Sequence, residues 1–512
     1  MYNDKKIVLF GAGINGRMAL RYFGQSRVQY FADNNVKLAG EKIYDIPVIS
    51  FSQLKEINND YQVVISTDIE PALEIAKQLE DAGIGQYEIF FKMLQEKSKE
   101  QITESIVQNQ SQLDLEEKNR TARIEATSSV AVHQNRKKYL VICNGGYPME
   151  DNPRCFFAHE RVLQYIKAGL DMEAFSFIWN APAARYKFGG VDVTEGGVSV
   201  LRDLLLKNHY EKLLIHFVDD DVMRAIQEAG KLDMPMIVWC HGYDVMPWYE
   251  LWFDYSQAQI ERDRKKWELL DILKINNLKK IYSMDNMHFI FVSEWEMERS
   301  KKFVGVLPKH CDVIHNYINY DFFALPAKKS DDRLRVLSIK NHASRVYAND
   351  LTAKAILELS EREFFPRLTF ELYGEGKLFE DNFGELIKKN FANVHIHRTF
   401  LSHDEMRDLF RSNGIFLSPT RVDSHQLTTS EAMAAGMSVV TSNAGPIREF
   451  MDESCGSIFE FDNYWMMAEE IEYLYFHPDE FLRKSQNAVQ RLRTQCSYEQ
   501  TIGRELQLIT GV

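Results

Sequence analysis

The sequence has few cysteines, no long hydrophobic run and no excess of basic residues. Its six cysteines are scattered without a CxxC pair or a paired spacing, which favours reduced, structural thiols in a cytoplasm. No apolar run approaches the roughly 18 residues of a membrane-spanning helix, and the opening MYNDKK lacks the apolar core of a signal peptide. The net charge of -13 argues against a nucleic-acid partner, which needs a basic face. We therefore expect a cytoplasmic protein.

What is present is the composition of a soluble globular chain, 45% hydrophobic and 26% charged, which is enough for sizeable buried cores. A length of 512 residues predicts roughly three domains. The apolar runs read as short strands separated by helices, without an internal repeat of solenoid period, so an α/β fold is expected. We place the segments at 1–97, 98–134, 135–325 and 326–512.

The first segment begins with an apolar run and a glycine pattern. The run 6–10 predicts a buried strand, and GAGING after it has the GxGxxG spacing of a dinucleotide-binding turn. A helix and a second strand are expected to follow. The candidate nucleotide ligands are Gly11, Gly13, Gly16 and, as a ribose-binding carboxylate, Asp33.

Two functions of this Rossmann-like domain stay open. NAD(P) binding would make the chain a nicotinamide-dependent oxidoreductase, although no residues for hydride transfer accompany the domain. The segment also resembles small Rossmann-like modules attached to bacterial polysaccharide-assembly enzymes, which implies a regulatory, assembly or vestigial role. The next segment, 98–134, is polar and rich in Gln, Glu and Ser. We expect a linker there, either one or two exposed helices or a partly disordered tether.

Two loops in the third segment follow predicted strands. Gly145 and Gly146 come after the strand 139–143, where they allow either a close approach of backbone amides to a diphosphate or acceptor, or a simple tight turn. Three aspartates, 219–221, directly follow another predicted strand of this segment. We favour capping of the following helix over a metal site for these aspartates, and we expect no metal.

His241 follows a further strand, 236–240, and precedes an unusually aromatic and basic stretch, 243–282. Its apolar positions follow helical spacing in places, so packing against a core with a solvated outer face is the default. The alternative is a surface that meets anionic lipid or a lipid diphosphate acceptor, which would bring the chain to the inner face of a membrane.

The last segment opens with a strand, 334–339, that ends before Lys340. A second cation, Arg345, lies five residues further on. Gly374 follows the strand 368–373 and begins a glycine turn. For each cation two interpretations stay open: a ligand for an anion, or a simple surface charge.

The stretch 415–449 carries the clearest pattern in the chain. An apolar run predicts a short strand, and a loop with Asp423 follows it. Ser430 is a plausible N-cap of the next helix, and Gly436 would end that helix before another strand. Strand, loop, helix N-terminus and strand together form the anion-binding edge of an open α/β sheet.

Asp423 and Glu431, with seven residues between them, resemble the acid-x7-acid signature of family-4 (group 1) retaining glycosyltransferases of the GT-B fold. The loop that begins at His241 is similar to the HG(x)D loop of the same family. Two features depart from the family pattern. Aspartate is the less usual first acid, and Ser424 and His425 stand where the family has glycines.

The resemblance implies two facing Rossmann-like halves over about residues 137–510, with the last helix crossing back onto the first half. It implies metal-independent transfer, with retention, from a nucleoside-diphosphate sugar to a glycan, lipid-linked or protein acceptor, in bacterial surface polysaccharide or glycoconjugate assembly. Asp423 would orient the sugar, Glu431 the ribose, and His241 would line the cleft. The implied donor-binding residues are Lys340, Arg345, Gly374, Ser424, His425 and Ser430. A non-catalytic assembly protein with a decayed transferase half is the alternative.

Overall fold

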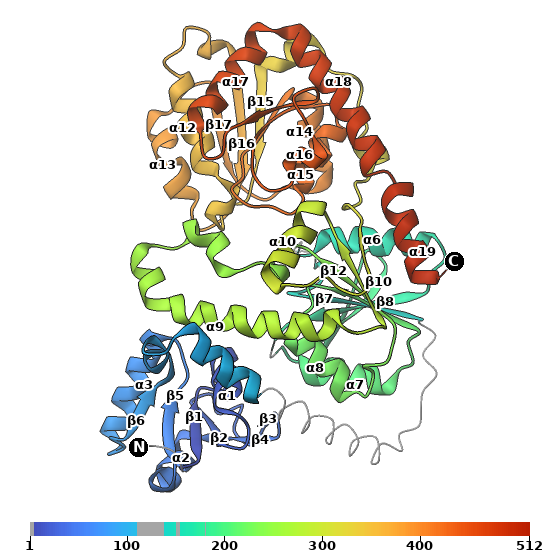
Figure 1. Ribbon diagram of the computed structural model, residues 1–512. Helices are drawn as coiled ribbons and strands as arrows, with labels where there is room; N and C mark the ends of the chain where they lie inside the picture. Colours follow the sequence, from blue (N-terminus) through green and yellow to red (C-terminus); the bar gives the residue numbers. More distant parts are fainter. Residues whose placement is uncertain (1–4, 110–137, 150–153, 180, 512) are drawn as a thin grey trace. The chain divides into compact units, whose positions relative to one another are not determined.

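The computed structural model of the chain describes residues 5–109, 138–149, 154–179 and 181–511 (Figure 1). These residues form three β-sheets, each flanked by helices, and they fall into two compact units. Unit 1 comprises the described part of Met1–Ala131 together with Ile226–Leu232 and Ser256–Lys280. Unit 2 holds the remaining described residues.

Unit 1 is built on a six-stranded sheet of order β3-β4-β2-β1-β5-β6, which is parallel except for the β3–β4 hairpin. Its strands are β1 (Ile7–Phe10), β2 (Val28–Asp33), β3 (Lys42–Ile43), β4 (Ile46–Ser50), β5 (Gln62–Ile65) and β6 (Tyr87–Ile89). Its helices include α1 (Ile14–Phe23), α2 (Phe51–Ile57), α3 (Ile69–Asp81) and α4 (Phe90–Gln95). The apolar run and the glycine pattern thus begin the parallel sheet that they predicted.

The first part of the expected linker packs into the core of unit 1. Residues 99–109 are helical, and Ile102 and Ile106 are fully buried beside Phe90 and Leu94. The two isoleucines lie four residues apart, so they form one apolar stripe on an otherwise polar helix. These residues are therefore not an exposed tether, and the rest of the expected linker lies outside the described residues.

The 26-residue helix α9 (Gln257–Tyr282) also contributes to this core. Leu269, Ile272 and Leu273 are buried in it, which is the helical core packing expected for the aromatic and basic stretch. Several of its cations are paired with acids on the same helix, as between Arg264 and Glu268, whose Nε and Oε1 lie 2.8 Å apart. The cations of α9 are therefore partly neutralised within unit 1.

The first half of unit 2 contains an eight-stranded sheet of order β14-β13-β12-β11-β7-β8-β10-β9, parallel except for the β9–β10 pair. Its strands are β7 (Tyr139–Asn144), β8 (Met172–Phe177), β9 (Ala184–Phe188), β10 (Val191–Gly196), β11 (Lys212–His216), β12 (Met236–Cys240), β13 (Met287–Phe291) and β14 (Cys311–Val313). Its helices are α6 (Phe156–Lys167), α7 (Val198–Lys207), α10 (Glu294–Val304), α11 (Tyr320–Phe323) and the larger part of α8 (Asp220–Glu228), whose last residues belong to unit 1.

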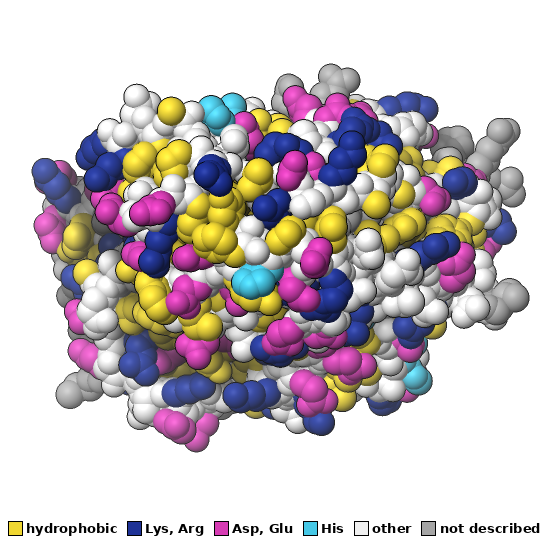
Figure 2. All heavy atoms as spheres, turned by 90° about the horizontal axis from the view of Figure 1, so that it is seen from above, with side chains coloured by type: hydrophobic (Ala, Val, Ile, Leu, Met, Phe, Trp, Pro, Cys, Tyr) yellow, Lys and Arg dark blue, Asp and Glu magenta, His cyan; other side chains and the backbone are white. Residues whose placement is uncertain are grey.

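The second half contains a six-stranded parallel sheet of order β17-β16-β15-β18-β19-β20. Its strands are β15 (Arg335–Ile339), β16 (Thr369–Gly374), β17 (Val394–Arg398), β18 (Ile415–Ser418), β19 (Ser438–Ser442) and β20 (Gly456–Phe459). Its helices are α12 (Asn349–Leu359), α13 (Phe379–Lys389), α14 (His403–Ser412), α15 (Leu427–Ala434), α16 (Ile447–Phe450), α17 (Tyr464–Phe476) and α18 (Pro478–Gln495). Hydrophobic side chains are visible among the charged ones on the face seen in Figure 2, the side on which α17 lies in Figure 1.

The end of the chain leaves the second half and packs on the first. After α18, the π-helical turn Glu499–Gly503 leads into α19 (Arg504–Thr510). The carboxylate of Glu505 is fully buried and accepts hydrogen bonds from Arg161 Nε at 3.0 Å, Tyr165 Oη at 2.6 Å and Trp239 Nε1 at 2.8 Å. These donors belong to α6 and β12, so a buried polar cluster joins the chain end to the first half.

Candidate functional site

The candidate site is centred on the loop between β18 and α15. Both β18 and β19 are completely buried. The loop between β18 and α15 follows the last residue of β18, so it leaves the carboxyl edge of the sheet. Helix α15 begins at Leu427 with Gln426 as its N-cap, whereas the sequence predicted Ser430. Gly436 follows the end of α15 with φ of 74°, in the left-handed conformation expected of a helix stop. The free amides of α15 therefore lie four residues earlier than predicted.

Asp423 lies in this loop beside a buried lysine. Its Oδ1 accepts a hydrogen bond from the backbone N–H of His425 at 3.0 Å. Burial raises the pKa of the Asp423 carboxyl, and the charges of Lys340 and, more weakly, Arg299 oppose that rise. Because Arg299 belongs to α10, the carboxyl of Asp423 is within electrostatic reach of the first half.

Glu431 lies inside α15 and is buried. Burial, and to a lesser extent the charge of Glu160, raise the pKa of Glu431 to about 8. Glu160 belongs to α6 of the first half. His403 Nε2, at the start of α14, lies 3.6 Å from Glu431 Oε1. The pKa of each acid of the predicted pair is therefore influenced by a charged group of the opposite half.

His425 is held by contacts on both ring nitrogens. Its Nδ1 accepts a hydrogen bond from Asn316 N–H at 3.1 Å, so the neutral ring carries its proton on Nε2 and donates it to Ser430 Oγ at 3.0 Å. The ring stacks on Phe450 with centroids 3.9 Å apart. Burial lowers its pKa far below the usual range. His425 and Ser430 thus fix the loop against the first half, and these contacts account for both residues without a ligand.

Ser424 lies against the glycine after His241. A Cβ atom added to Gly242 would lie 2.2 Å from Ser424 Oγ, so only glycine fits this approach between the halves. His241 itself lies next to His216, with His241 Nε2 and His216 Nδ1 3.0 Å apart. Burial lowers the pKa of His241 well below its usual range. The loop similar to HG(x)D and the loop of Asp423 are therefore in contact.

The two predicted cations differ in environment. Lys340 is buried, and this burial lowers its pKa to about 8, while the charge of Asp423 acts in the opposite direction. Arg345 is exposed, and its backbone N–H donates to Asp254 Oδ1 of the first half at 2.6 Å. Gly374 packs against the Lys340 carbonyl, which an added Cβ would approach to 2.0 Å. Lys340 is therefore placed beside Asp423, and Gly374 packs against Lys340.

The other loops have structural explanations. Gly145 and Gly146 have φ of 95° and 111°, which suits a tight turn, and the approach of their backbone amides to a diphosphate or acceptor stays a prediction. Asp219 Oδ1 accepts hydrogen bonds from the backbone N–H groups of Asp221 at 3.0 Å and Val222 at 2.9 Å, and so caps α8 as expected.

Apart from His241, sequence reasoning missed the charged groups that the first half brings to this site. Arg299 donates from Nη1 to Glu250 Oε2 at 3.0 Å and is buried, yet its Nε and Nη2 have no hydrogen-bond partner among the described residues. The charge of Glu160 contributes to the raised pKa of Glu431, and Asp254 holds the loop of Arg345. The signal available in the sequence was that Arg299 and Glu160 sit in helices that follow predicted strands.

The glycine loop of unit 1 is also explained by packing. A Cβ on Gly16 would lie 1.9 Å from the Gly11 carbonyl oxygen, so helix and strand approach closely. Asp33 Oδ2 accepts a hydrogen bond from Ala12 N–H at 2.8 Å, and Oδ1 accepts one from Asn35 N–H at 2.8 Å. Asp33 thus stabilises the loop itself. Binding of NAD(P) at Gly11, Gly13, Gly16 and Asp33 stays a prediction.

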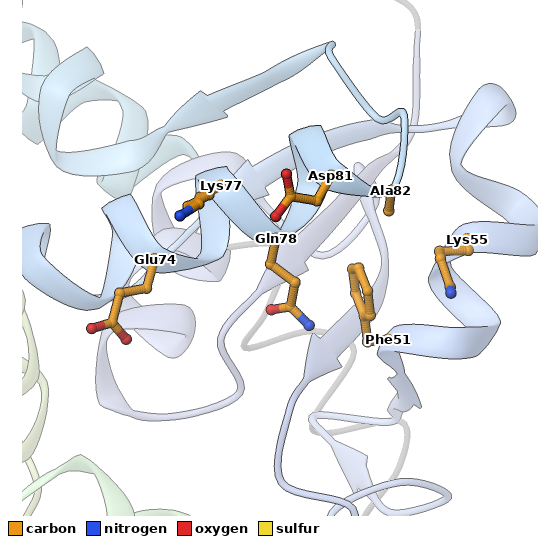
Figure 3. Close-up of a pocket in the computed structure, with 7 residues that line it drawn as sticks. All are labelled: Phe51, Lys55, Glu74, Lys77, Gln78, Asp81 and Ala82. Carbon is orange, nitrogen blue, oxygen red and sulfur yellow. The ribbon is translucent and has the colours of Figure 1, made fainter.

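Unit 1 also has an open surface hollow of about 430 Å³ (Figure 3). Its lining residues are Phe51, Lys55, Glu74, Lys77, Gln78, Asp81 and Ala82. They come from α2 and from α3 and the residue after it, and they include neither the glycines of the loop nor Asp33. The hollow mixes cations and carboxylates, so it shows no preference for a ligand of one charge.

No group of three or more His, Cys, Asp or Glu side chains is arranged to hold a metal ion within the described residues. In the same part of the chain, no helix has both the length and the apolar composition needed to cross a bilayer. All six cysteines are free thiols.

Comparison with known proteins gives one family match. Residues 333–477 match the model of the glycosyl transferases group 1. This segment runs from the strand before Lys340 to the end of α17, and it includes Asp423 and Glu431. No curated protein matches the sequence.

Solved structures similar to the chain are glycosyltransferases. Sucrose-phosphate synthase from Thermosynechococcus elongatus is 14% identical, with 73% of this chain and 99% of that chain covered and a TM-score of 0.57. Alr3699/HepE of Anabaena, in complex with UDP and glucose, is 11% identical over 73% of this chain and 100% of that chain, with a TM-score of 0.53. WaaG, a glycosyltransferase involved in lipopolysaccharide biosynthesis, is 13% identical over 73% and 100%, also with a TM-score of 0.53. The chain therefore has the α/β architecture of GT-B glycosyltransferases, as its sequence predicted.

Proposed function

We propose that the protein is a metal-independent glycosyltransferase that moves a sugar from a nucleoside-diphosphate sugar to an acceptor, with retention at the anomeric carbon. The acceptor is a glycan, a lipid-linked glycan or a protein, and the reaction belongs to bacterial surface polysaccharide or glycoconjugate assembly in the cytoplasm. Unit 1 is an accessory Rossmann-like domain in this proposal.

One observation carries the proposal. Asp423 and Glu431, the acids of the matching family segment, each lie within electrostatic reach of the opposite half, Asp423 of Arg299 and Glu431 of Glu160. Two Rossmann-like halves that meet at the carboxyl edge of one sheet create the usual ligand crevice of open α/β folds. The arrangement supports a sugar nucleotide bound between the halves of unit 2.

The proposed role of each residue follows from its charge. Lys340 and the first amides of α15 would stabilise the diphosphate as negative charge grows on it during departure. Glu431 would accept hydrogen bonds from the ribose hydroxyls, and Asp423 from hydroxyls of the donor sugar. Arg345 would have to turn its exposed guanidinium toward the crevice to join Lys340.

The chemistry needs no group beyond these. The bond between the anomeric carbon and the diphosphate oxygen breaks, and an acceptor hydroxyl oxygen attacks the same face of that carbon. The acceptor proton passes to an oxygen of the departing diphosphate. His241, Gly242 and Ser424 would close the crevice around the sugar and exclude water.

A thermal-shift screen with UDP-, GDP-, ADP- and TDP-sugars tests the proposal. We expect one nucleotide to raise the midpoint of unfolding, because a ligand that binds only the folded state stabilises it. The shift should disappear in Lys340→Ala and in Glu431→Ala. A panel without any shift would favour a non-catalytic assembly protein instead. Retention is read from the anomeric coupling constant of the product by proton NMR.

A further inference from the structure

A short aromatic segment, residues 243–254, borders the candidate site in unit 2. It follows directly from His241 and Gly242 and consists of the two 3₁₀ turns Tyr243–Val245 and Trp248–Asp254. Turns of this length cannot bury side chains against a core of their own. The segment must therefore be held by its neighbours, and its outer face is available for binding.

Polar contacts fix the inner side of the aromatic segment to both halves. Asp244 Oδ1 accepts a hydrogen bond from His241 N–H at 3.0 Å, and Glu250 Oε2 accepts one from Arg299 Nη1 at 3.0 Å. Asp254 Oδ2 accepts a hydrogen bond from Ser344 Oγ at 2.5 Å in the second half. Its Oδ1 also binds the backbone N–H of Arg345. The segment thus contacts the loop of His241 in the first half and the loop of Arg345 in the second.

Three aromatic side chains of the segment remain exposed. The exposed fractions are 69% for Tyr243, 54% for Tyr249 and 61% for Trp252. Three large aromatic side chains left exposed within one 12-residue segment favour a binding surface, because each costs free energy when left in water. Tyrosine and tryptophan combine an apolar ring with a polar group, which suits ligands that are part apolar and part hydroxylated.

The charge of the segment indicates which ligand fits. Its sequence, YDVMPWYELWFD, contains three acids and no lysine or arginine. An anionic membrane surface attracts basic segments, so this segment is the opposite of what a membrane would select. All three acids accept the inner-side hydrogen bonds described above, so the outer face is left to the aromatic rings. A neutral saccharide, which has hydroxyl groups and apolar C–H faces, needs no charged partner on such a face.

We propose that Tyr243, Tyr249 and Trp252 form an acceptor subsite that stacks against the rings of a saccharide. This inference rests on the proposed transferase function, and it deepens that function by naming a carbohydrate, rather than a membrane surface, as the group that the segment binds. The rings hold the acceptor at the entrance, and its hydroxyl reaches the crevice between Asp423 and His241.

Binding of the unmodified full-length protein to a glycan array of neutral and uronic acid oligosaccharides tests the subsite without any donor. We expect wild-type protein to bind neutral glycans. Trp252→Ala should bind them at least about tenfold more weakly. Trp465→Ala is the matched control. Trp465 is also an exposed tryptophan, with an exposed fraction of 47%, but it lies on α17, far from the aromatic segment in the sequence. This control should bind like the wild type.

The readouts separate this inference from the proposed function. Donor binding in the thermal-shift screen should be the same in Trp252→Ala as in the wild type, and in transfer assays the variant should raise KM for the acceptor more than it lowers kcat. Equal glycan binding by Trp252→Ala and wild type, or no glycan binding at all, would overturn the subsite. Binding of the wild type to phosphatidylglycerol vesicles that is lost in Trp252→Ala would show a membrane surface instead. Absence of any donor shift would contradict the transferase proposal, whatever the array shows.

Discussion

Lys340 and Glu431 are held near the midpoint of their titrations at neutral to mildly alkaline pH. Burial lowers the pKa of Lys340 to about 8 and raises the pKa of Glu431 to about 8. For the proposed donor, Lys340 must be protonated to pair with the diphosphate, and Glu431 must be ionised to accept ribose hydroxyls. Rising pH therefore weakens one contact and strengthens the other, and the two effects can be separated by substitution.

Replacing Glu431 with Gln leaves Lys340 as the titrating donor contact. The Kd for the nucleotide sugar found in the screen should rise with pH above about 8, because Lys340 then has to take up a proton on binding. The limiting slope is about tenfold per pH unit. Isothermal titration calorimetry between pH 7 and 9.5 measures this, and a flat profile would remove Lys340 from the diphosphate site.

The Lys340→Arg variant isolates Glu431 in the same way. Arginine stays charged throughout, so the affinity should improve as the pH rises toward 8 and level off above it, because Glu431 loses its proton. The same calorimetric series applies, with circular dichroism to check that the buried guanidinium is tolerated. An affinity that declines over this range would contradict the ribose role of Glu431.

At this scale the sequence predicted the residues of the second half better than those of the first. Asp423 and Glu431 belong to one strand–loop–helix pattern, and Lys340 directly follows a predicted strand, so all three could be picked out along the chain. Arg299 and Glu160 reach the site from helices more than 120 residues earlier in the sequence, where spacing carries no information about proximity. The contact of His425 with Asn316 could not be predicted for the same reason, since the two residues lie 109 positions apart, and donor binding by His425 and Ser430 stays a prediction.

Helix α10 is capped from two directions. Ser293 Oγ accepts a hydrogen bond from Glu296 N–H at 3.2 Å. The carboxylate of Glu449, from α16 of the second half, accepts hydrogen bonds from Glu294 N–H at 2.9 Å and Trp295 N–H at 2.6 Å. Glu449 therefore joins the halves through a helix N-terminus, where a negative charge is favourable.

We expect Glu449→Ala to destabilise unit 2 by about 1–2 kcal/mol, because it removes a charged cap and leaves two amides without a partner. Glu453→Ala is the control, since Glu453 lies close by in the sequence and its ion pair is with exposed Arg448. Urea denaturation of both variants measures the difference. An equal midpoint for the two variants would show that the cap contributes nothing.

Strand positions were predictable because their apolar runs are short and clearly bounded. The runs 415–417 and 236–240 became β18 and β12 within one residue. The start of α15 was not predictable, because Ser430 has the residue type of a cap but uses its hydroxyl for His425. A tertiary hydrogen bond thus overrode the local preference of serine for an N-cap position.

Unit 2 is closed by its chain end. Glu505 is fully buried with Arg161, Tyr165 and Trp239, three donors that lie between 266 and 344 residues away in the sequence. The crossing of the last helix was expected from the family resemblance alone. Nothing in the composition of residues 498–508 indicated that an ion pair would anchor it.

Loss of this anchor should be costly. Glu505→Ala would leave Arg161 charged and buried without its carboxylate, which destabilises a fold by about 3–5 kcal/mol. Glu505→Gln keeps the volume and part of the hydrogen bonding, so its effect should be smaller. Differential scanning calorimetry compares the two, and a change in Glu505→Ala no larger than in an exposed control such as Glu499→Ala would contradict the anchoring role.

Release of nucleoside diphosphate from a panel of sugar nucleotides tests the central claim most directly, since slow hydrolysis needs the donor site but no acceptor. The account predicts that one donor is hydrolysed by the wild type and by Trp465→Ala, and that Lys340→Ala and Glu431→Ala each lose most of this turnover. Turnover that is unchanged in both site variants would contradict a sugar nucleotide gripped between the two halves.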